Sequence, residues 1–196
     1  MNKRRALVAG CLIIVLTMAA CGGLRYSRHA PDAQDFNCRS IGILPVDAGT
    51  YAESRGIADR TFADILLEKG CFTSVVTSET IQRKMTTDDE LTKIVVDYLT
   101  KLKTVNFSDP DLAARIGAHF DVDAFLVVKV DFWNYTVEGD DKIAKVGFSM
   151  NLVDVETGEV VWEAGHHEGR DYWLIKPDLI DVAEDVAEAM INEMPH

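Results

Sequence analysis

The sequence is poor in basic residues and contains none of the common catalytic motifs. Only 20 lysines and arginines stand against 32 aspartates and glutamates. The resulting net charge of −12 argues against a nucleic-acid-binding protein, whose binding surface would be basic. The patterns G-x-S-x-G, Walker A, G-x-G-x-x-G, H-E-x-x-H and C-x-x-C are all absent. We therefore expect a protein that is not an enzyme, with no catalytic residue and no cofactor.

Potential metal ligands are also sparse. His166-His167-Glu168 is the densest group, but adjacent residues of a strand point to opposite faces, so the two histidines would converge poorly on one ion. We expect a solvated loop at this position. Asp121 and Asp123 are typical turn formers before a strand, so the sequence predicts no metal site.

The first twenty residues have the pattern of a secretion signal. Lys3, Arg4 and Arg5 precede an uncharged apolar run over residues 6–20. Met18-Ala-Ala-Cys21 then resembles a bacterial lipobox, which implies cleavage before Cys21 and diacylation of its thiol. The alternative is a short transmembrane anchor, because residues 6–24 are uncharged. Among such lipoproteins, an aspartate after the cysteine favours the inner membrane; Gly22 stands there instead, which favours the outer membrane.

Three segments follow from this pattern: a signal peptide over residues 1–20, the lipidated Cys21 with a flexible tether over residues 21–37, and one folded domain over residues 38–196. In that domain, apolar runs predict strands over 40–46 and 72–76, with a helix between them that ends at Gly70. Strand, helix and strand in about 35 residues indicate a parallel pair.

The rest of the domain alternates helices with hairpins. Apolar stripes predict helices over 87–103, 109–116 and 177–194, and alternation predicts strands over 124–137, 144–152 and 159–164. Apolar residues make up 47% of the chain, enough for a packed core. The expected fold is an α/β (α+β) sandwich: one mixed sheet with helices packed on it.

Four segments, taken in order, resemble the CsgG/LpoB/PelC-like family of periplasmic lipoprotein domains. They are Ile41-Gly-Ile-Leu-Pro-Val46, Gly70-Cys-Phe-Thr-Ser-Val-Val76, Ile116-Gly-Ala-His-Phe-Asp-Val-Asp-Ala-Phe125 and Leu152-Val-Asp-Val-Glu-Thr-Gly-Glu-Val-Val-Trp162. The resemblance covers nearly all of residues 38–196 and implies an anticodon-binding-like or TolB N-terminal-like domain.

The resemblance also implies a role in the cell envelope. The chain is too short for the membrane hairpins of the CsgG-type pores, and the predicted tether is too short for the long arm of the LpoB-type activators. Length and tether favour the PelC-like branch, which forms a ring under the outer membrane and serves exopolysaccharide export. An LpoB-like activator of a cell-wall synthase and a surface lipoprotein of unassigned role stay open as alternatives.

Two cysteines remain once Cys11 is removed with the signal and Cys21 is acylated. Cys38 and Cys71 each precede one of the two predicted parallel strands, and we expect them to form a disulfide in an oxidising compartment. The alternative is a pair of buried free thiols.

Aromatic residues of the second half predict a contact surface. Trp133, Tyr135, Tyr172 and Trp173 are expected to meet a membrane or a neighbouring subunit, because indole and phenol rings favour interfaces that are apolar on one side and wet on the other. The alternative for Trp133 and Tyr135 is a place in the core.

The last predicted helix is acidic on one side. Its apolar stripe fixes the buried side, so the carboxylates must share the solvent-facing one, with Lys176 as the nearest base along the chain. These acids are Asp178, Asp181, Glu184, Asp185 and Glu188. The helix could simply be a solubilising face. Repeated around a ring, it would instead concentrate negative potential and guide a cationic polysaccharide towards an export pore.

Overall fold

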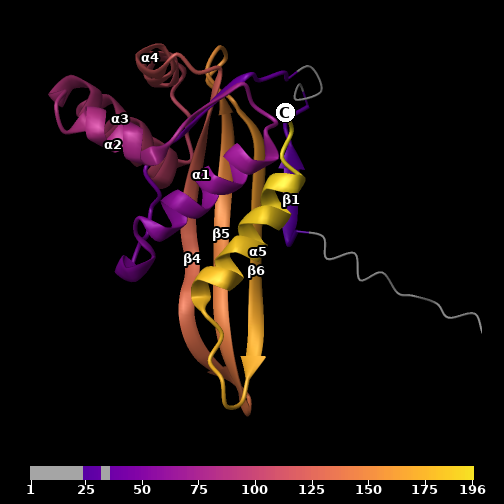
Figure 1. Cartoon of the computed structure of the whole chain (residues 1–196). Helices are drawn as coiled ribbons and strands as arrows, with labels where there is room; N and C mark the ends of the chain where they lie inside the picture. The colour runs from indigo at the N-terminus through magenta and orange to yellow at the C-terminus, as the bar shows by residue number, and fades with distance from the viewer. Residues whose placement is uncertain (1–23, 32–35) are drawn as a thin grey trace, which may run out of the picture.

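Three long antiparallel strands dominate the computed structural model, which describes residues 24–31 and 36–196 (Figure 1). They belong to one six-stranded sheet with the order β1-β6-β5-β4-β2-β3. The strands are β1 (Tyr26–His29), β2 (Ser40–Ile43), β3 (Ser74–Val76), β4 (Ala124–Glu138), β5 (Asp141–Asp154) and β6 (Val160–Tyr172). The predicted signal peptide and the predicted acylation site Cys21 lie outside the described residues.

The sheet is mixed, as the sequence predicts. Strand β2 pairs in parallel with both β3 and β4, while β4, β5, β6 and β1 pair antiparallel. The helices are η2 (Ala52–Ser54), α1 (Ile57–Lys69), α2 (Ser78–Met85), α3 (Asp89–Val105), α4 (Pro110–Phe120) and α5 (Leu179–Asn192). The α/β fold with helices packed on a mixed sheet is therefore confirmed.

Helices α1 and α5 cover one face of the sheet, which we call the covered face (Figure 1). Inward-pointing residues of the long strands, among them Phe148 and Trp162, are completely buried there against Phe62 of α1 and Val186 of α5. Burial of so many apolar side chains makes this face the main source of stability.

The opposite face, which we call the open face, is covered only near one end. Helices α3 and α4 pack Tyr98 and Ile116 against Phe125 and Val153, at the end of the sheet where β2 pairs with β4. Beyond this second core, β4, β5 and β6 project past the helices as a three-stranded ribbon (Figure 1). A loop follows β6 at the far end of this ribbon, and we call that end the tip.

The N-terminal strand corrects one expectation. Residues 26–29, assigned above to a flexible tether, form β1 and pair with β6 from Gly165 to Trp162. The Nε1 of Trp162 donates a hydrogen bond to the Ser27 hydroxyl at 2.9 Å, which joins the two strands further. All four residues of β1 are exposed, so the segment lacks the apolar alternation by which a strand is recognised. The folded domain thus begins at Tyr26 rather than at residue 38.

Candidate functional site

An exposed apolar loop forms part of the tip of the ribbon. Trp173, Leu174 and Ile175, between β6 and α5, are 84%, 81% and 86% exposed. Strand register places them beside the β4–β5 turn, because Tyr172 lies opposite Lys142 and Asp141 lies opposite Glu138. Three consecutive large apolar side chains in water mark an interaction site rather than a packing element.

Tyr135 holds this loop in place from the covered face. Its hydroxyl donates a hydrogen bond of 2.8 Å to the carbonyl oxygen of Pro177, and the Lys176 ammonium lies 3.5 Å from its ring centre. Tyr172 meets the same ring edge to face at 6.0 Å. Partial burial raises the pKa of Tyr135, and the negative charge of Asp178 adds to the effect. Tyr135 and Tyr172 thus contact the loop that presents Trp173.

Trp133 does not belong to this surface. Only 3% of it is exposed, and it packs against Phe148 at 6.5 Å between ring centres. Its strand partner is Val146, which points into the covered face, so Trp133 points there as well. The prediction that Trp133 contacts a membrane or a subunit is therefore wrong, and its alternative as a core residue is correct.

The five acids of the last helix are all exposed, but three of them already have partners. Asp178 is the N-cap of α5 and accepts a hydrogen bond from the Ile180 amide at 2.9 Å. Asp185 forms an ion pair with Arg170, and Glu188 forms one of 3.1 Å with Lys69 of α1. Proximity along the chain, which singles out Lys176, does not reveal these two bases.

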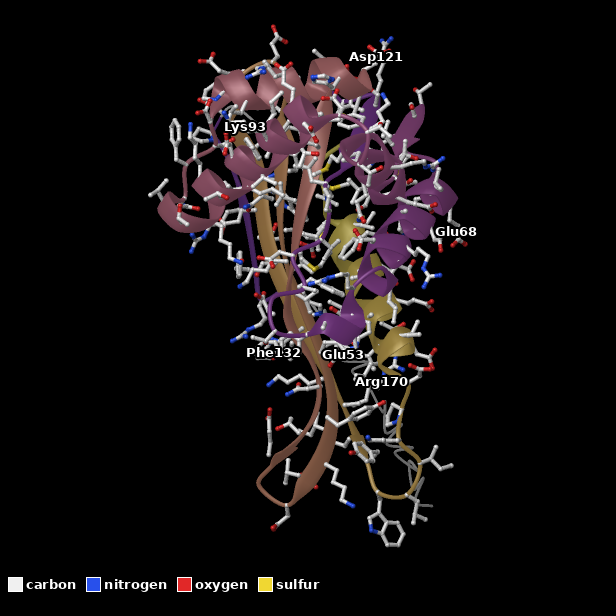
Figure 2. All side chains as sticks on the ribbon, turned by 90° about the vertical axis from the view of Figure 1, so that its left-hand side faces the viewer. Glu53, Glu68, Lys93, Asp121, Phe132 and Arg170 are labelled. Carbon is white, nitrogen blue, oxygen red and sulfur yellow. The ribbon has the colours of Figure 1, made fainter. Side chains whose placement is uncertain are left out.

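Three of the five acids form no ion pair among the described residues: Asp178, which caps the helix, and Asp181 and Glu184. Glu184 and Glu188 line a groove of about 660 Å³ between α5 and α1. Asp64 and Glu68 line it from the α1 side, where Figure 2 places Glu68, while Arg170 lies lower, beside α5. The covered face of the sheet therefore carries an acidic outer surface built from two helices.

The predicted disulfide is not formed, since Cys38 and Cys71 are both free thiols. The Thr73 amide donates to the Arg39 carbonyl at 2.7 Å, so the parallel register continued towards the N-terminus places Phe72, not Cys71, beside Cys38. Cys38 is buried whereas Cys71 is exposed. Burial raises the pKa of the Cys38 thiol to about 12, with a further contribution from the charge of Asp123, which keeps this thiol protonated and unreactive.

His166, His167 and Glu168 lie within β6, so the expected solvated loop is wrong. The two histidines do occupy opposite faces. The Arg25 guanidinium donates a hydrogen bond of 2.9 Å to Nδ1 of His167, which also meets Phe132 on the open face, while His166 lies 3.8 Å from Glu168. Partial burial lowers the pKa of His167, and the neighbouring charge of Arg25 lowers it further. In the part of the chain that the structure describes, no cluster of three metal-ligating side chains exists.

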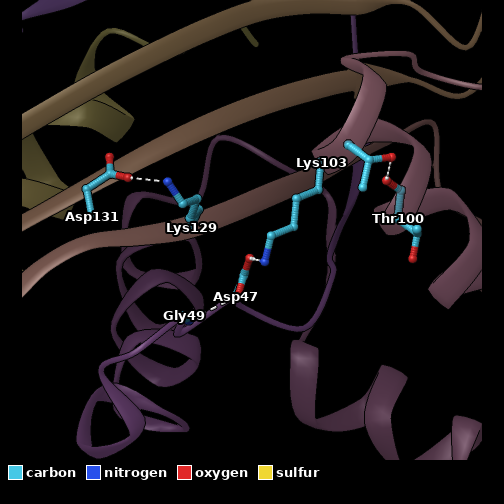
Figure 3. A network of polar contacts seen from close by, with 7 residues as sticks. Asp47, Gly49, Thr100, Lys103, Lys129 and Asp131 are labelled. Atoms are coloured by element: carbon cyan, nitrogen blue, oxygen red, sulfur yellow. Dashed lines mark hydrogen bonds and ion pairs between the residues drawn. The ribbon is translucent and has the colours of Figure 1, made fainter.

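A groove under α3 on the open face has no signal in the local sequence. It has a volume of about 760 Å³, and both α3 and the sheet line it with apolar and polar residues. Asp47, after β2, forms an ion pair of 2.7 Å with Lys103 of α3, and Lys129 forms one of 2.8 Å with Asp131 (Figure 3). The hydrogen bond from Lys103 lowers the pKa of Asp47. These charges neutralise one another in pairs, whereas Glu163, which also lines the groove, takes part in no ion pair among the described residues.

The chain matches no family model and no curated protein. Solved structures do resemble it. The PelC dodecamer from Paraburkholderia phytofirmans aligns with a TM-score of 0.53 at 17% identity, over 85% of this chain and 92% of that one. A single-substitution variant of that dodecamer aligns with a TM-score of 0.52 at 16% identity, over 85% of this chain and 96% of that one. Lipoprotein GNA1162 from Neisseria meningitidis aligns with a TM-score of 0.48 at 16% identity, over 79% of this chain and 96% of that one.

The two PelC likenesses establish the fold and nothing finer. The PelC-like resemblance inferred from the sequence is confirmed at this level. Within residues 24–31 and 36–196, no helix is both long and apolar enough to cross a bilayer.

Proposed function

We propose that this protein is a lipid-anchored, non-enzymatic component of the outer membrane, on its periplasmic side, and that it serves polysaccharide export as a ring of identical copies. The observation that carries the membrane part is the exposed loop of Trp173, Leu174 and Ile175. A tryptophan followed by two aliphatic residues suits the boundary between headgroups and acyl chains, where the indole finds both apolar and polar surroundings.

The path of the N-terminus supports the same orientation. Strand β1 runs antiparallel to β6, so the chain before Tyr26 is directed towards the tip, and Arg25 already contacts His167. Cys21 precedes Tyr26 by five residues, which span at most about 17 Å. Along β6, seven residues separate Gly165 from Tyr172, a distance of about 23 Å.

These lengths connect the anchor and the tip. A lipidated Cys21 at full reach stops about 6 Å short of Tyr172, so the residues beyond Tyr172 must enter the bilayer by at least this depth. Interfacial segments insert their apolar side by about 5–10 Å. The predicted anchor and the exposed loop are therefore geometrically compatible with one membrane surface.

The export role rests on the acidic outer surface of α5. The carboxylates of Asp181 and Glu184 have neither an ion pair nor a capping role, and around a closed ring they would repeat once per copy. The structurally similar PelC is a dodecamer. A ring of this kind would attract a cationic polysaccharide by its potential, without forming or breaking a covalent bond. The short anchor argues against the LpoB-like alternative, which requires a long reach.

The membrane part is tested by replacing Leu174 and Ile175 with serine in the anchored protein, while Trp173 is kept as the fluorescent reporter. Trp133 and Trp162 are buried, so quenching of exposed tryptophan by brominated lipid reports on Trp173. We expect the native chain to be quenched and blue-shifted in neutral vesicles, and the variant to lose both signals. Leu67→Ser serves as the control, because Leu67 is 55% exposed on α1, away from the tip. A native chain with a fully solvent-exposed Trp173 signal would contradict the proposal.

The export part is tested by Asp181→Asn combined with Glu184→Gln. This pair removes two charges without breaking an ion pair, whereas changes at Asp185 or Glu188 would break one. We expect reduced polymer export from cells in which the variant is folded and anchored. Glu53→Gln, at an exposed position of η2, is the matched control. Normal export by the double variant would reject the guiding role and leave α5 as a solubilising face.

A further inference from the structure

The tip is acidic as well as apolar. Residues 138–145 and 171–178, which flank the exposed loop, contain five carboxylates and three ammonium groups, a net charge of −2. The carboxylates are those of Glu138, Asp140, Asp141, Asp171 and Asp178, and the bases are Lys142, Lys145 and Lys176.

Two of the three bases are already engaged within the molecule. Lys145 forms an ion pair of 2.8 Å with Glu138, and Lys176 lies over the Tyr135 ring. Asp140 and Asp141, in the β4–β5 turn, are exposed and form no ion pair among the described residues. The turn therefore presents unmatched negative charge to whatever the tip approaches.

Strand register fixes this turn at the depth of the apolar loop. Lys142 is opposite Tyr172, the last residue before Trp173, and Asp141 is one residue nearer the end of the ribbon. When Trp173 enters a bilayer, Asp140 and Asp141 must consequently reach the headgroup layer, within one Debye length of the lipid charges.

We propose that the tip discriminates between lipid surfaces: it inserts into a net-neutral, zwitterionic bilayer and is repelled by an anionic one, and the β4–β5 turn is the discriminating element. This inference rests on the proposed membrane function. An anionic leaflet has a surface potential of about −30 mV, which disfavours each approaching negative charge about threefold, so a net charge of −2 corresponds to about a tenfold effect.

The experiment uses the full lipidated protein in two kinds of vesicle. One contains only phosphatidylcholine, and the other contains about one third phosphatidylglycerol. Both carry brominated lipid, so quenching of Trp173 gives the ratio of inserted to free tips in a protein that stays anchored throughout. We expect this ratio to be about tenfold lower in the anionic vesicles at low salt, and high salt should reduce the difference.

Two variants with equal charge changes identify the source of the effect. Asp140→Asn with Asp141→Asn should restore insertion into anionic vesicles, while Asp64→Asn with Glu68→Gln, on α1, should not. Equal insertion of the native tip into both vesicles overturns the inference but leaves the membrane function standing. Equal rescue by the α1 pair also overturns it, because the effect would then be one of overall charge. Failure of Trp173 to insert even into neutral vesicles overturns both proposals.

Discussion

Asp59 is a buried carboxylate that joins three segments of the chain. Its Oδ1 accepts a hydrogen bond from the Val46 amide at 3.1 Å and another from the Ser78 hydroxyl, and its Oδ2 accepts one from the Gly56 amide at 3.1 Å. Only 7% of the residue is exposed. The loop after β2, the start of α1 and the start of α2 are thus fixed by one side chain, which nothing in the local sequence distinguishes from other acids of α1.

We predict that Asp59→Ala lowers the free energy of unfolding by about 2–4 kcal/mol, because it leaves buried donors without an acceptor. Urea denaturation measures this change. Asp64→Ala, at an exposed position of the same helix, should change it by less than about 0.5 kcal/mol. Equal losses in the two variants would show that the hydrogen bonds of Asp59 contribute nothing beyond the loss of a carboxylate from α1.

The carboxyl group of Asp123 makes the free energy of unfolding depend on pH in the acid range. Its Oδ2 accepts hydrogen bonds of 2.9 Å from the amides of Arg39 and Ser40, and these bonds lower the pKa of the carboxyl. The stabilisation is therefore complete above the ordinary aspartate pKa and disappears as the pH falls through the lower pKa of the folded state.

We accordingly expect Asp123→Asn to be less stable than the native chain at pH 7, and the difference to shrink below about pH 4. Urea midpoints for both proteins at pH 7 and pH 3 measure it. Asp64→Asn provides the reference for loss of an exposed charge. A difference that is constant with pH would mean that the carboxylate form contributes nothing beyond its shape.

At the scale of elements, the turn between β5 and β6 is locked against α4. Gly158 has a φ of +72°, and a Cβ there would lie 2.4 Å from the Cα of Pro110. Ser108, just before α4, donates a hydrogen bond of 2.5 Å to the Gly158 carbonyl. The glycine of the Asp154–Gly158 turn thus meets two demands, a left-handed backbone and a close approach to another chain segment.

A pair of glycine variants separates these two demands. Gly139, in the β4–β5 turn, has a φ of +66° but no atom within 4 Å of the added Cβ. We predict that Gly139→Ala costs about 1–2 kcal/mol of stability for the left-handed backbone alone. Gly158→Ala should cost about 1–3 kcal/mol more, because backbone atoms must move apart. Equal urea midpoints for the two variants would contradict close packing of the turn on α4.

Elements with strong periodicity were predictable from the sequence, whereas positions set by register were not. The parallel pair of β2 and β3, the apolar face of α3 and the alternation of β5 all followed from local patterns. Strand β1 could not be predicted from the sequence, because both of its faces are exposed and it has no apolar alternation. Cys38 and Cys71 were misassigned because a shift of one residue in register decides whether two side chains meet.

The candidate site also contains some features that the sequence predicts and others that depend on packing. The exposure of Trp173 followed from its place in a loop after a strand. The partners of Asp185 and Glu188 did not, because Arg170 and Lys69 come close only once β6 and α1 pack against α5. The pair of Asp47 and Lys103, 56 residues apart, likewise has no signal in the sequence.

At the scale of the whole molecule, the short link between Cys21 and β1 would couple the proposed lipid anchor to the tip. We predict that a flexible insertion of about twelve residues between Gly23 and Leu24 reduces the inserted fraction of Trp173 severalfold, because it lowers the effective concentration of the tip at the membrane. Quenching by brominated lipid measures this fraction. The same insertion appended after His196 should have no effect, and unchanged quenching in the first variant would refute the coupling.

The projecting ribbon also bears on whether copies of the protein aggregate. Strand β1 ends its pairing with β6 at Gly165, and β2 with the segment after it bonds β4 only up to Val130. Beyond these points, the outer edges of the ribbon carry backbone groups that no described strand satisfies. Such edges invite chains to add to one another and aggregate. Between Gly165 and Tyr172, β6 has five ionisable residues, His166, His167, Glu168, Arg170 and Asp171. In the proposed membrane-anchored ring, charge along this edge would keep neighbouring copies from joining their sheets, so that they would recognise each other through side chains.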